Sequence, residues 1–371
     1  MTSAQIVPDT EHRGLVGRLP PRLRAYALLA RRMDFHRQAQ VNLLSSVLGA
    51  LAAIGGAYAG LGVWTLVLAP AVLFATRAIG LTIAARAWMW PSFDFRGAGH
   101  LARYGGMVAG ASLLGFAQSQ ADILVAGRWF DAHVVGVYTT ALFLTQIFTN
   151  KVVPPINEVA FSAYARMRHD QDAVARGFVR SVRLLMLIAV PFFIGLAVTA
   201  GPVVALALGP QWHEAGPLVV LLGLAMPFMT LQALFPPAVD AMGRPGTTAG
   251  TTAIGAIVLP VAFLIGARFG IRGIAGAWIV AHPLLLAVVA ARALPVIGLS
   301  AAAFVGAIAP AFGAAAAMAG AVTLTAQLVG PLPPLPLLAL SVAVGGSVYA
   351  MTLWLFARTA VRDAWAMLRR S

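Results

Sequence analysis

Residues 184–203 read LLMLIAVPFFIGLAVTAGPV, a run of 20 residues without a charged side chain. A helix needs about 20 apolar residues to cross the hydrocarbon core of a bilayer. Several other runs in the chain are as long and as apolar. A segment inside lipid must satisfy its own backbone hydrogen bonds, and these runs lack the alternating pattern of membrane strands. The run therefore predicts an α-helical membrane protein.

The composition agrees with lipid as the solvent. Of the 371 residues, 60% are hydrophobic and 10% are charged, whereas a soluble domain carries about 25% charged residues. The sequence has no cysteine, which excludes disulfides and thiolate metal sites, and its 7 histidines have no ligand-like spacing. We therefore expect neither a metal nor a cofactor.

The predicted fold class is an all-α polytopic membrane protein with about ten transmembrane helices. The predicted spans cover residues 41–60, 63–85, 104–126, 134–165, 184–203, 216–237, 248–268, 273–291, 301–325 and 335–356. The fourth is too long for one straight crossing. We expect it to be a helix that is broken at Pro154-Pro155 and continues into the cytoplasm.

Basic residues fall mainly in alternate loops, beginning with the N-terminal segment. Cytoplasmic loops of membrane proteins are enriched in Lys and Arg, so this pattern predicts both termini in the cytoplasm. The net charge of +14 then reflects loops that face anionic lipid, and no nucleic-acid partner is expected. The first 40 residues are polar and basic, unlike a secretory signal peptide.

A Gly-x-aromatic motif recurs where predicted outer turns enter a helix, at Gly62-Val63-Trp64, Gly136-Val137-Tyr138 and Gly276-Ala277-Trp278. The aromatic side chains are expected at the water–lipid interface, where Trp and Tyr are enriched. The motif indicates either the stacked hairpins of a transporter built from repeats or a general preference of outer turns for these residues.

Six short stretches carry a resemblance to a known family. They are LLARRMDF (28–35), GLGVWTLV (60–67), DILVAGR (122–128), GVYTTA (136–141), LGPQWHEAGP (208–217) and AMGRP (241–245). In order and spacing they resemble the oligosaccharide flippases of the polysaccharide transporter family, within the larger group that includes multidrug and toxin extruders. The resemblance covers roughly residues 25–300.

The resemblance implies two six-helix lobes that face a central cavity, often with two extra C-terminal helices. We accordingly expect a basic cytoplasmic segment (1–40), two helices of the first lobe (41–100), a complete second lobe (101–298), and two extra helices with a basic tail (299–371). About four N-terminal helices of the family pattern are missing. A late start codon, a truncated gene and a split protein completed by another chain are the three explanations.

The implied function is the flipping of a polyprenyl-diphosphate-linked oligosaccharide across the bacterial inner membrane by alternating access, for surface polysaccharide or lipopolysaccharide. The expected partners are this glycan, the bilayer and a polysaccharide polymerase or ligase. A multidrug extruder of the same fold and a non-transporting fragment or scaffold subunit are the alternatives. The sequence has no Gly-rich loop ending in Lys-Ser or Lys-Thr and no nucleophile elbow, so we do not expect an enzyme.

Lys151 is the first candidate site residue, because an ionisable group inside a bilayer is costly and usually faces protein or water. It follows Asn150 in the middle of a span and precedes Pro154-Pro155, which leave two carbonyls without donors. An ammonium beside free carbonyls suits a diphosphate. The alternatives are an ion pair with Glu158 and snorkelling of the lysine stem to the interface.

Amide side chains form a polar stripe along the same span. Gln146 and Asn150 are one turn apart, and Asn157 lies two turns beyond Asn150. A stripe of amides facing lipid would be unfavourable. The stripe is therefore expected to face the interior, whether that interior is packed or hydrated.

Gln118 and Asp122 are four residues apart on one face of the third span, whereas Gln120 is expected to point elsewhere. Both side chains are candidates to line the cavity and contact sugar hydroxyls, and Asp122 is also a candidate for a coupling proton or cation. The alternative for both is a hydrogen bond between helices.

Arg77, two turns from the cytoplasmic end of the second span, is a further candidate. It would either meet the diphosphate or snorkel to the interface. Gln232, Asp240 and His282 are weaker candidates: Asp240 is a possible partner of Arg244, and His282 beside Pro283 is expected to be a packed histidine.

Overall fold

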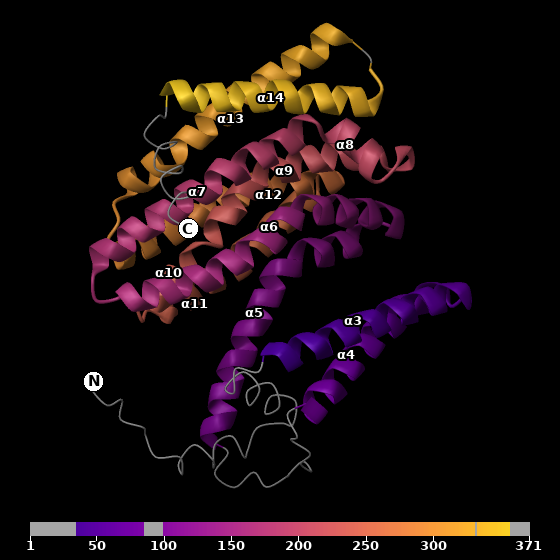
Figure 1. Ribbon diagram of the computed structural model, residues 1–371, viewed down its shortest axis with the longest axis vertical. Helices are drawn as coiled ribbons and strands as arrows, with labels where there is room; N and C mark the ends of the chain where they lie inside the picture. Colours follow the sequence, from indigo (N-terminus) through magenta and orange to yellow (C-terminus); the bar gives the residue numbers. More distant parts are fainter. Residues whose placement is uncertain (1–34, 85–98, 331, 357–371) are drawn as a thin grey trace. The chain divides into compact units, whose positions relative to one another are not determined.

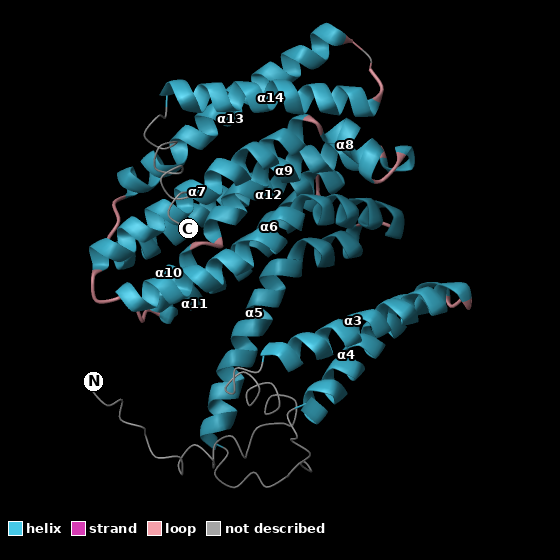
Figure 2. Ribbon diagram, viewed as in Figure 1, coloured by secondary structure: helices cyan, strands magenta, loops and turns pink. Residues whose placement is uncertain are grey.

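The structure, a computed structural model, describes residues 35–84, 99–330 and 332–356. The chain divides into two compact units, Met1–Ala102 and Arg103–Ser371, and each is described by itself. Every regular element in the described ranges is a helix, and successive helices within residues 35–84 and 99–330 are joined by short turns (Figures 1 and 2).

The first unit contains a helical hairpin. Helix α3 (Phe35–Tyr58) is followed by the short η1 (Gly62–Trp64) and by α4 (Thr65–Ala84). Gly60 and Gly62 have φ angles of 71° and 52° in the turn, a region that glycine adopts without steric cost. A Cβ at Gly80 would lie 2.7 Å from Cγ1 of Val41, so the missing side chain lets the two helices approach closely.

The second unit contains the remaining helices. They are α5 (Gly99–Trp129, which starts just before the division), α6 (Ala132–Met167), α7 (Gln171–Val198), α8 (Ala200–Ala207), η2 (Pro210–Trp212), α9 (Ala215–Gln232), α10 (Phe235–Ala241), α11 (Pro245–Ala267), α12 (Gly270–Ile297), α13 (Ala301–Val329) and α14 (Pro334–Phe356). Asp131 caps α6 by accepting from the Val134 N–H, and Asp170 caps α7 by accepting from the Ala173 N–H.

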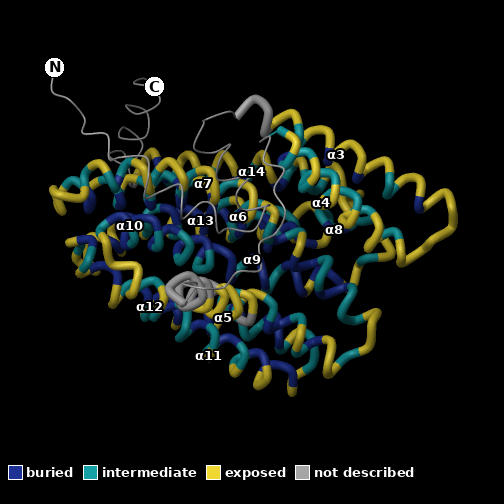
Figure 3. The backbone as a smooth tube through the Cα atoms, turned by 90° about the horizontal axis from the view of Figure 1, so that it is seen from below, coloured by how far each residue is buried: buried dark blue, intermediate teal, exposed yellow. Residues whose placement is uncertain are grey.

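Helix α9 lies at the centre of the second unit, in contact with α6, α7 and α12. With α10 it forms the most buried of the candidate spans, as expected for a helix that is apolar on all sides. Figure 3 shows the buried residues between the helices and the exposed ones on their outer sides. Helix α13 packs on α7, and α14 packs on α13 and α8.

The predicted fold class is confirmed. In the described part of the chain, 9 helices or helix pairs are long and apolar enough to cross a membrane. The third predicted span, residues 104–126, is not among these nine; it corresponds to α5, which has 31 residues but is interrupted by polar side chains. The division into residues 1–40, 41–100, 101–298 and 299–371 stays a prediction, and most of the first segment and the C-terminal tail lie outside the described residues.

The predicted break at Pro154-Pro155 was wrong. Helix α6 runs without interruption from Ala132 to Met167. Membrane helices tolerate proline where the freed carbonyls find other partners. The interruption occurs instead between α9 and α10, just before a second pair, Pro236-Pro237, inside the span that was predicted to be continuous.

Two of the three aromatic residues of this motif lie inside the bundle and not on its surface, and the interfacial position stays a prediction. Trp64 is 73% exposed, whereas Tyr138 is 0% and Trp278 5% exposed. The indole Nε1–H of Trp278 donates to the Tyr138 hydroxyl at 3.0 Å. Their polar tips are therefore satisfied inside the bundle and need no interfacial water.

Candidate functional site

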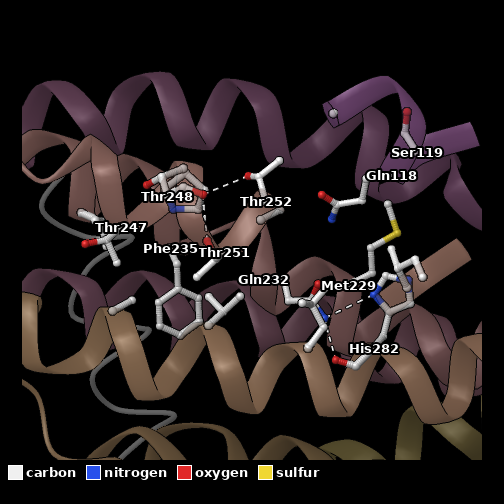
Figure 4. A pocket seen from close by; sticks show the side chains of 18 of the residues that line it. Gln118, Ser119, Met229, Gln232, Phe235, Thr247, Thr248, Thr251, Thr252 and His282 are labelled. Atoms are coloured by element: carbon white, nitrogen blue, oxygen red, sulfur yellow. Dashed lines mark hydrogen bonds between the residues drawn. The ribbon is translucent and has the colours of Figure 1, made fainter. Parts of the chain in front are cut away.

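A cavity of about 540 Å³ lies within the second unit, between α5, α6, α9, α10, α11 and α12 (Figure 4). Both apolar and polar side chains line it, and we call it the polar cavity for the latter. Its polar lining consists of amides, hydroxyls and one imidazole: Gln118, Ser119, Gln120, Gln146, Asn150, Gln232, Thr247, Thr248, Thr251, Thr252 and His282. Among the described lining residues there is no Asp, Glu, Lys or Arg. Such a surface offers many hydrogen-bond donors and acceptors without a net charge.

Helix α6 supplies two of the amides. Gln146 and Asn150 are four residues apart, so they share one face of the helix. Outside the cavity lining, the buried Thr149 of α6 and Thr230 of α9 form a hydrogen bond between their hydroxyls at 3.0 Å and tie the two helices together. The interhelical bond keeps the polar face of α6 next to the cavity.

Helix α11 contributes a row of threonines at its beginning. Thr247, Thr248, Thr251 and Thr252 fall at spacings of one and four residues, which places them on one side of the helix. The hydroxyls of Thr251 and Thr252 donate to the Thr248 carbonyl at 2.9 and 3.0 Å. The Thr248 hydroxyl donates to Oδ1 of Asp240 at 2.7 Å. The oxygen atoms of these hydroxyls keep lone pairs that can accept from a ligand.

The interruption between α9 and α10 opens the backbone beside the cavity. Pro237 has no N–H, so the carbonyl of Ala233 lacks its helical donor. The side-chain amide of Asn157 donates to that carbonyl at 2.8 Å. Asn157 thus replaces the missing helical bond and joins α6 to the interruption.

His282 and Gln232 meet across the cavity wall. The Gln232 amide nitrogen lies 2.6 Å from the His282 carbonyl oxygen and 3.3 Å from its Nδ1. The imidazole stacks on the Trp278 indole, with ring centroids 4.7 Å apart. His282 is 4% exposed, and its Nε2 has no hydrogen-bond partner among the described residues.

The predicted site residues fall into two groups. Gln118, Gln146 and Asn150 lie together in the cavity lining. Asn157 is half-buried and lies outside the lining, where it holds the Ala233 carbonyl. Gln120 lines the same cavity as Gln118, so the expectation that it points elsewhere was wrong.

The predicted charged residues do not line this cavity. Asp122 is 1% exposed and accepts from the Tyr138 hydroxyl at 2.7 Å. Lys151 is exposed and makes no hydrogen bond or ion pair with another described residue, Glu158 included. Arg77 is half-buried on α4 in the first unit. The roles suggested for these three side chains stay predictions.

The threonine row was missed in the sequence. Its signal is the stretch TTAGTTA at residues 247–253, which repeats a Thr-Thr pair after four residues. Hydroxyl groups are common in membrane helices, where they bond to their own backbone, so the pattern alone does not indicate a cavity. His282 and Gln232, ranked low from the sequence, are lining residues.

The lack of a metal-binding group among the described residues and the lining of a second cavity narrow the kind of ligand that the site could hold. Within the described residues no group of three or more His, Cys, Asp or Glu could hold a metal ion. A second cavity of about 540 Å³, between α6, α7, α8, α13 and α14, is lined mostly by apolar side chains such as Phe192, Met318 and Val322. The cavity with the amides is therefore the candidate site for a polar, uncharged ligand.

The fold is similar to a solved flippase. The inward closed conformation of the lipid II flippase MurJ superposes with a TM-score of 0.72, at 12% sequence identity, over 92% of this chain and 72% of that chain. At this identity the likeness concerns the fold alone.

Two curated proteins are similar in sequence. The succinoglycan biosynthesis transport protein ExoT of Rhizobium meliloti (strain 1021) is 28% identical over 63% of this chain and 49% of its own length. The amylovoran biosynthesis protein AmsL of Erwinia amylovora is 28% identical over 46% of this chain and 45% of its own length. The matched region is thus about half the length of each relative.

The family model described as polysaccharide biosynthesis protein matches residues 23–217, more than half of the chain. This match agrees with the sequence motifs, with the names of the two relatives and with the fold. The chain belongs to the polysaccharide biosynthesis protein family, the flippase family that its motifs resemble.

Proposed function

We propose that this protein takes part in moving a polyprenyl-diphosphate-linked oligosaccharide across the bacterial inner membrane for surface polysaccharide. The observation that carries the proposal is the uncharged cavity of amides and hydroxyls inside an apolar helical bundle. Polar side chains are costly within a membrane unless they are satisfied. The hydroxyl groups of a glycan both donate and accept hydrogen bonds, so they can pair with the amides and hydroxyls of this lining.

The charged residues are proposed to serve the diphosphate. Lys151 directly follows Asn150, a cavity residue, and its side chain is exposed. Arg77 lies on α4 as a second candidate. A phosphate oxygen prefers a cationic donor, and the cavity itself has none among its described residues.

Transport is proposed to proceed by alternating access. Two features support it: the division of the chain into two compact units, and the interrupted helices α7–α8 and α9–α10. Short interruptions of this kind absorb the backbone rotation that domain movements need. The proposal includes cytoplasmic termini, no enzymatic activity of its own, and a polysaccharide polymerase or ligase as a downstream partner.

The cavity does not favour a multidrug extruder. Such a transporter would bind organic cations, and a carboxylate in the pocket would be needed to offset their charge. Asp122 is buried beside Tyr138, and Asp240 accepts from Thr248, so neither lies among the lining residues.

The test is deletion of the gene in the organism that carries it, followed by complementation with the full chain. We expect deletion to lower surface polysaccharide and to leave lipid-linked glycan on the cytoplasmic leaflet. Complementation with Gln146→Leu should restore export poorly, whereas Gln211→Leu, in the exposed η2 turn, should restore it fully. Unchanged polysaccharide and unchanged sidedness of the lipid-linked glycan after deletion would refute the proposal.

A further inference from the structure

Arg292 is an exposed arginine on α12, beside the polar cavity. It follows the cavity residue Val289 by three positions and directly precedes the cavity residue Ala293. Residues three apart on a helix are neighbours on its surface, so Arg292 lies close to the side of α12 that borders the cavity. Its guanidinium makes no hydrogen bond or ion pair with another residue in the described part of the chain. The group is therefore accessible and available to a ligand.

The guanidinium lies against a glycine of α11. A Cβ at Gly250 would be 3.3 Å from Nη1 of Arg292, and no other atom from outside α11 would lie within 4 Å of it. A residue without a side chain lets a neighbouring group approach the helix closely. Gly250 thus leaves the space beside α11 in which the guanidinium rests.

This position places the guanidinium near the threonine row. Thr247 and Gly250 are three residues apart, so the Arg292 Nη1 atom lies at most about 9 Å from the Thr247 Cβ. Thr247 lines the cavity, and its hydroxyl has no hydrogen-bond partner among the described residues. Figure 4 shows the four threonines at one end of the cavity and His282 at the other. We call the first of these the threonine end.

The helices at the threonine end carry more positive than negative charge. Residues 235–253 and 285–297 together contain Arg244, Arg292 and one carboxylate, that of Asp240. Asp240 accepts a hydrogen bond from the threonine row and forms no ion pair with either arginine. The beginning of α11 adds the partial positive charge of a helix N-terminus. An anion bound beside Arg292 would offset this excess.

We propose that Arg292 binds the diphosphate of the lipid-linked glycan at the threonine end, while the adjoining sugars occupy the polar cavity. This inference rests on the proposed function and adds a cationic residue beside the cavity to Lys151 and Arg77. A guanidinium is a planar fork of N–H donors that matches two phosphate oxygens, and hydrogen bonds between ionised partners are the strong ones. The Thr247 hydroxyl is a second donor within reach of the same ligand.

The first experiment measures the binding of inorganic pyrophosphate by calorimetry. The full chain is placed in nanodiscs of phosphatidylcholine, so that anionic lipid does not compete for the arginine. Loss of a charged contact should weaken binding at least about tenfold in Arg292→Gln. Arg272→Gln, at an exposed position near the other end of α12, should bind like the wild type. Equal affinity of Arg292→Gln and the wild type, an equal loss in Arg272→Gln, or no binding by the wild type would overturn the inference.

The second experiment tests the position of the guanidinium without changing any charge. In Gly250→Leu the new side chain takes the space beside α11 and displaces the guanidinium, so pyrophosphate should bind more weakly. Gly246→Leu, on the same helix with open space at its Cβ, is the control and should bind normally. Arg292→Lys keeps the charge but loses the fork and should be intermediate. Equal affinity of the two leucine variants would show that the guanidinium does not act from this place.

Export in the deletion strain separates this inference from the proposed function. At equal protein level, Arg292→Gln should restore surface polysaccharide poorly and Arg272→Gln fully. If deletion abolishes export and Arg292→Gln restores it fully, the Arg292 inference fails while the flippase function stands. If deletion leaves both polysaccharide and the sidedness of the lipid-linked glycan unchanged, the flippase function fails, and Arg292 with it as a site for that diphosphate.

Discussion

The hydroxyl of Tyr138 on α6 donates a hydrogen bond to Oδ2 of Asp122 on the preceding helix, α5, at 2.7 Å. Trp278 donates to the same hydroxyl at 3.0 Å and also lines the polar cavity. Helices α5, α6 and α12 are thus joined by one buried chain of hydrogen bonds. Asp122 contacts the cavity lining through this chain and not by lining the cavity itself.

Replacing Tyr138 with phenylalanine should destabilise the protein by about 1 kcal/mol. The change leaves the Asp122 carboxyl and the Trp278 N–H without their partner, and interhelical hydrogen bonds in membranes contribute about 0.6–1.7 kcal/mol. The difference in stability is measured on the purified protein in detergent, by heating it and monitoring the fraction that stays monodisperse. Tyr58→Phe, at a residue that is exposed in α3, is the control. Equal stability of the two variants would contradict a structural role for the chain.

The turn between α11 and α12 depends on two glycines. A Cβ at Gly266 would lie 2.5 Å from the carbonyl oxygen of Gly273, and a Cβ at Gly273 would collide with the Gly266 backbone. Gly273→Ala should therefore destabilise the protein by about 2 kcal/mol, the usual cost of overpacking. Gly276→Ala, in the same helix with nothing within 4 Å of its Cβ, should be neutral or stabilising. Thermal stability in detergent distinguishes them, and a tolerated Gly273→Ala would show that the hairpin can separate.

Asp131 should make the start of α6 sensitive to acid. The backbone N–H of Val134 donates to Oδ1 of Asp131 at 3.0 Å and lowers the pKa of that carboxyl below its ordinary value of 3.8. Because the folded-state pKa is the lower one, the stabilisation is present above pH 3.8 and is lost as the pH falls through the folded-state pKa. Asp131→Asn keeps a good cap without a titrating group. Its stability should depend less on pH than that of the wild type in this range, and identical pH profiles would contradict the capping role.

Lys151→Ala should reduce export at least about tenfold if the ammonium contacts the diphosphate, since a hydrogen bond to a charged group contributes about 1.5–3 kcal/mol. Lys151→Arg should retain much of the activity because it keeps the charge. Glu158→Gln is the control, since the structure shows no ion pair between the two described residues. The measurement is surface polysaccharide per unit of membrane protein in the deletion strain. Undiminished polymer in Lys151→Ala would reject the contact.

The helices could be predicted from the sequence because length and apolarity alone decide whether a segment crosses a membrane. Residues 184–198 of the predicted span 184–203 lie in α7, which begins earlier, at Gln171, and the helix ends at Val198, before α8 begins at Ala200. The place of the interruption could not be predicted. Pro154-Pro155 and Pro236-Pro237 look alike in the sequence, but the second pair frees a carbonyl that Asn157 reaches from another helix. Such a compensating donor is a tertiary contact with no local signature.

Only some residues of the polar cavity could be predicted, because only some of them have a signal within a single helix. Gln146 and Asn150 were found because an amide stripe facing lipid is unfavourable, an argument that needs only one helix. Asn157 also faces protein, as that argument requires, but it lies outside the cavity lining, where its side-chain NH₂ donates to the Ala233 carbonyl. His282, expected to be a packed histidine, is 4% exposed and stacks on Trp278, and its contact with Gln232, 50 residues earlier, is a tertiary contact with no local signature.

Gly255 offers a way to disturb the cavity without changing any of its polar residues. It is buried on α11, and a Cβ there would lie 2.7 Å from the Gln118 amide nitrogen. That atom is at the end of a flexible side chain, so Gly255→Ala should fold while the amide is displaced. We expect export to fall about fivefold, the loss of roughly one hydrogen bond to the glycan. Gly246→Ala, on the same helix with open space at its Cβ, is the control and should export normally.

The effect of Gly255→Ala should also depend on Gln118. If the alanine acts by moving the amide, then Gly255→Ala should add nothing once Gln118→Ala has removed it, so the two changes will be non-additive. If the alanine acts by distorting the packing of α11, the two effects will add. Export and protein level measured for the two single variants and the double variant decide between these outcomes. Additive losses would mean that the Gln118 amide does not contact the transported molecule, even though the Gln118 side chain lines the cavity.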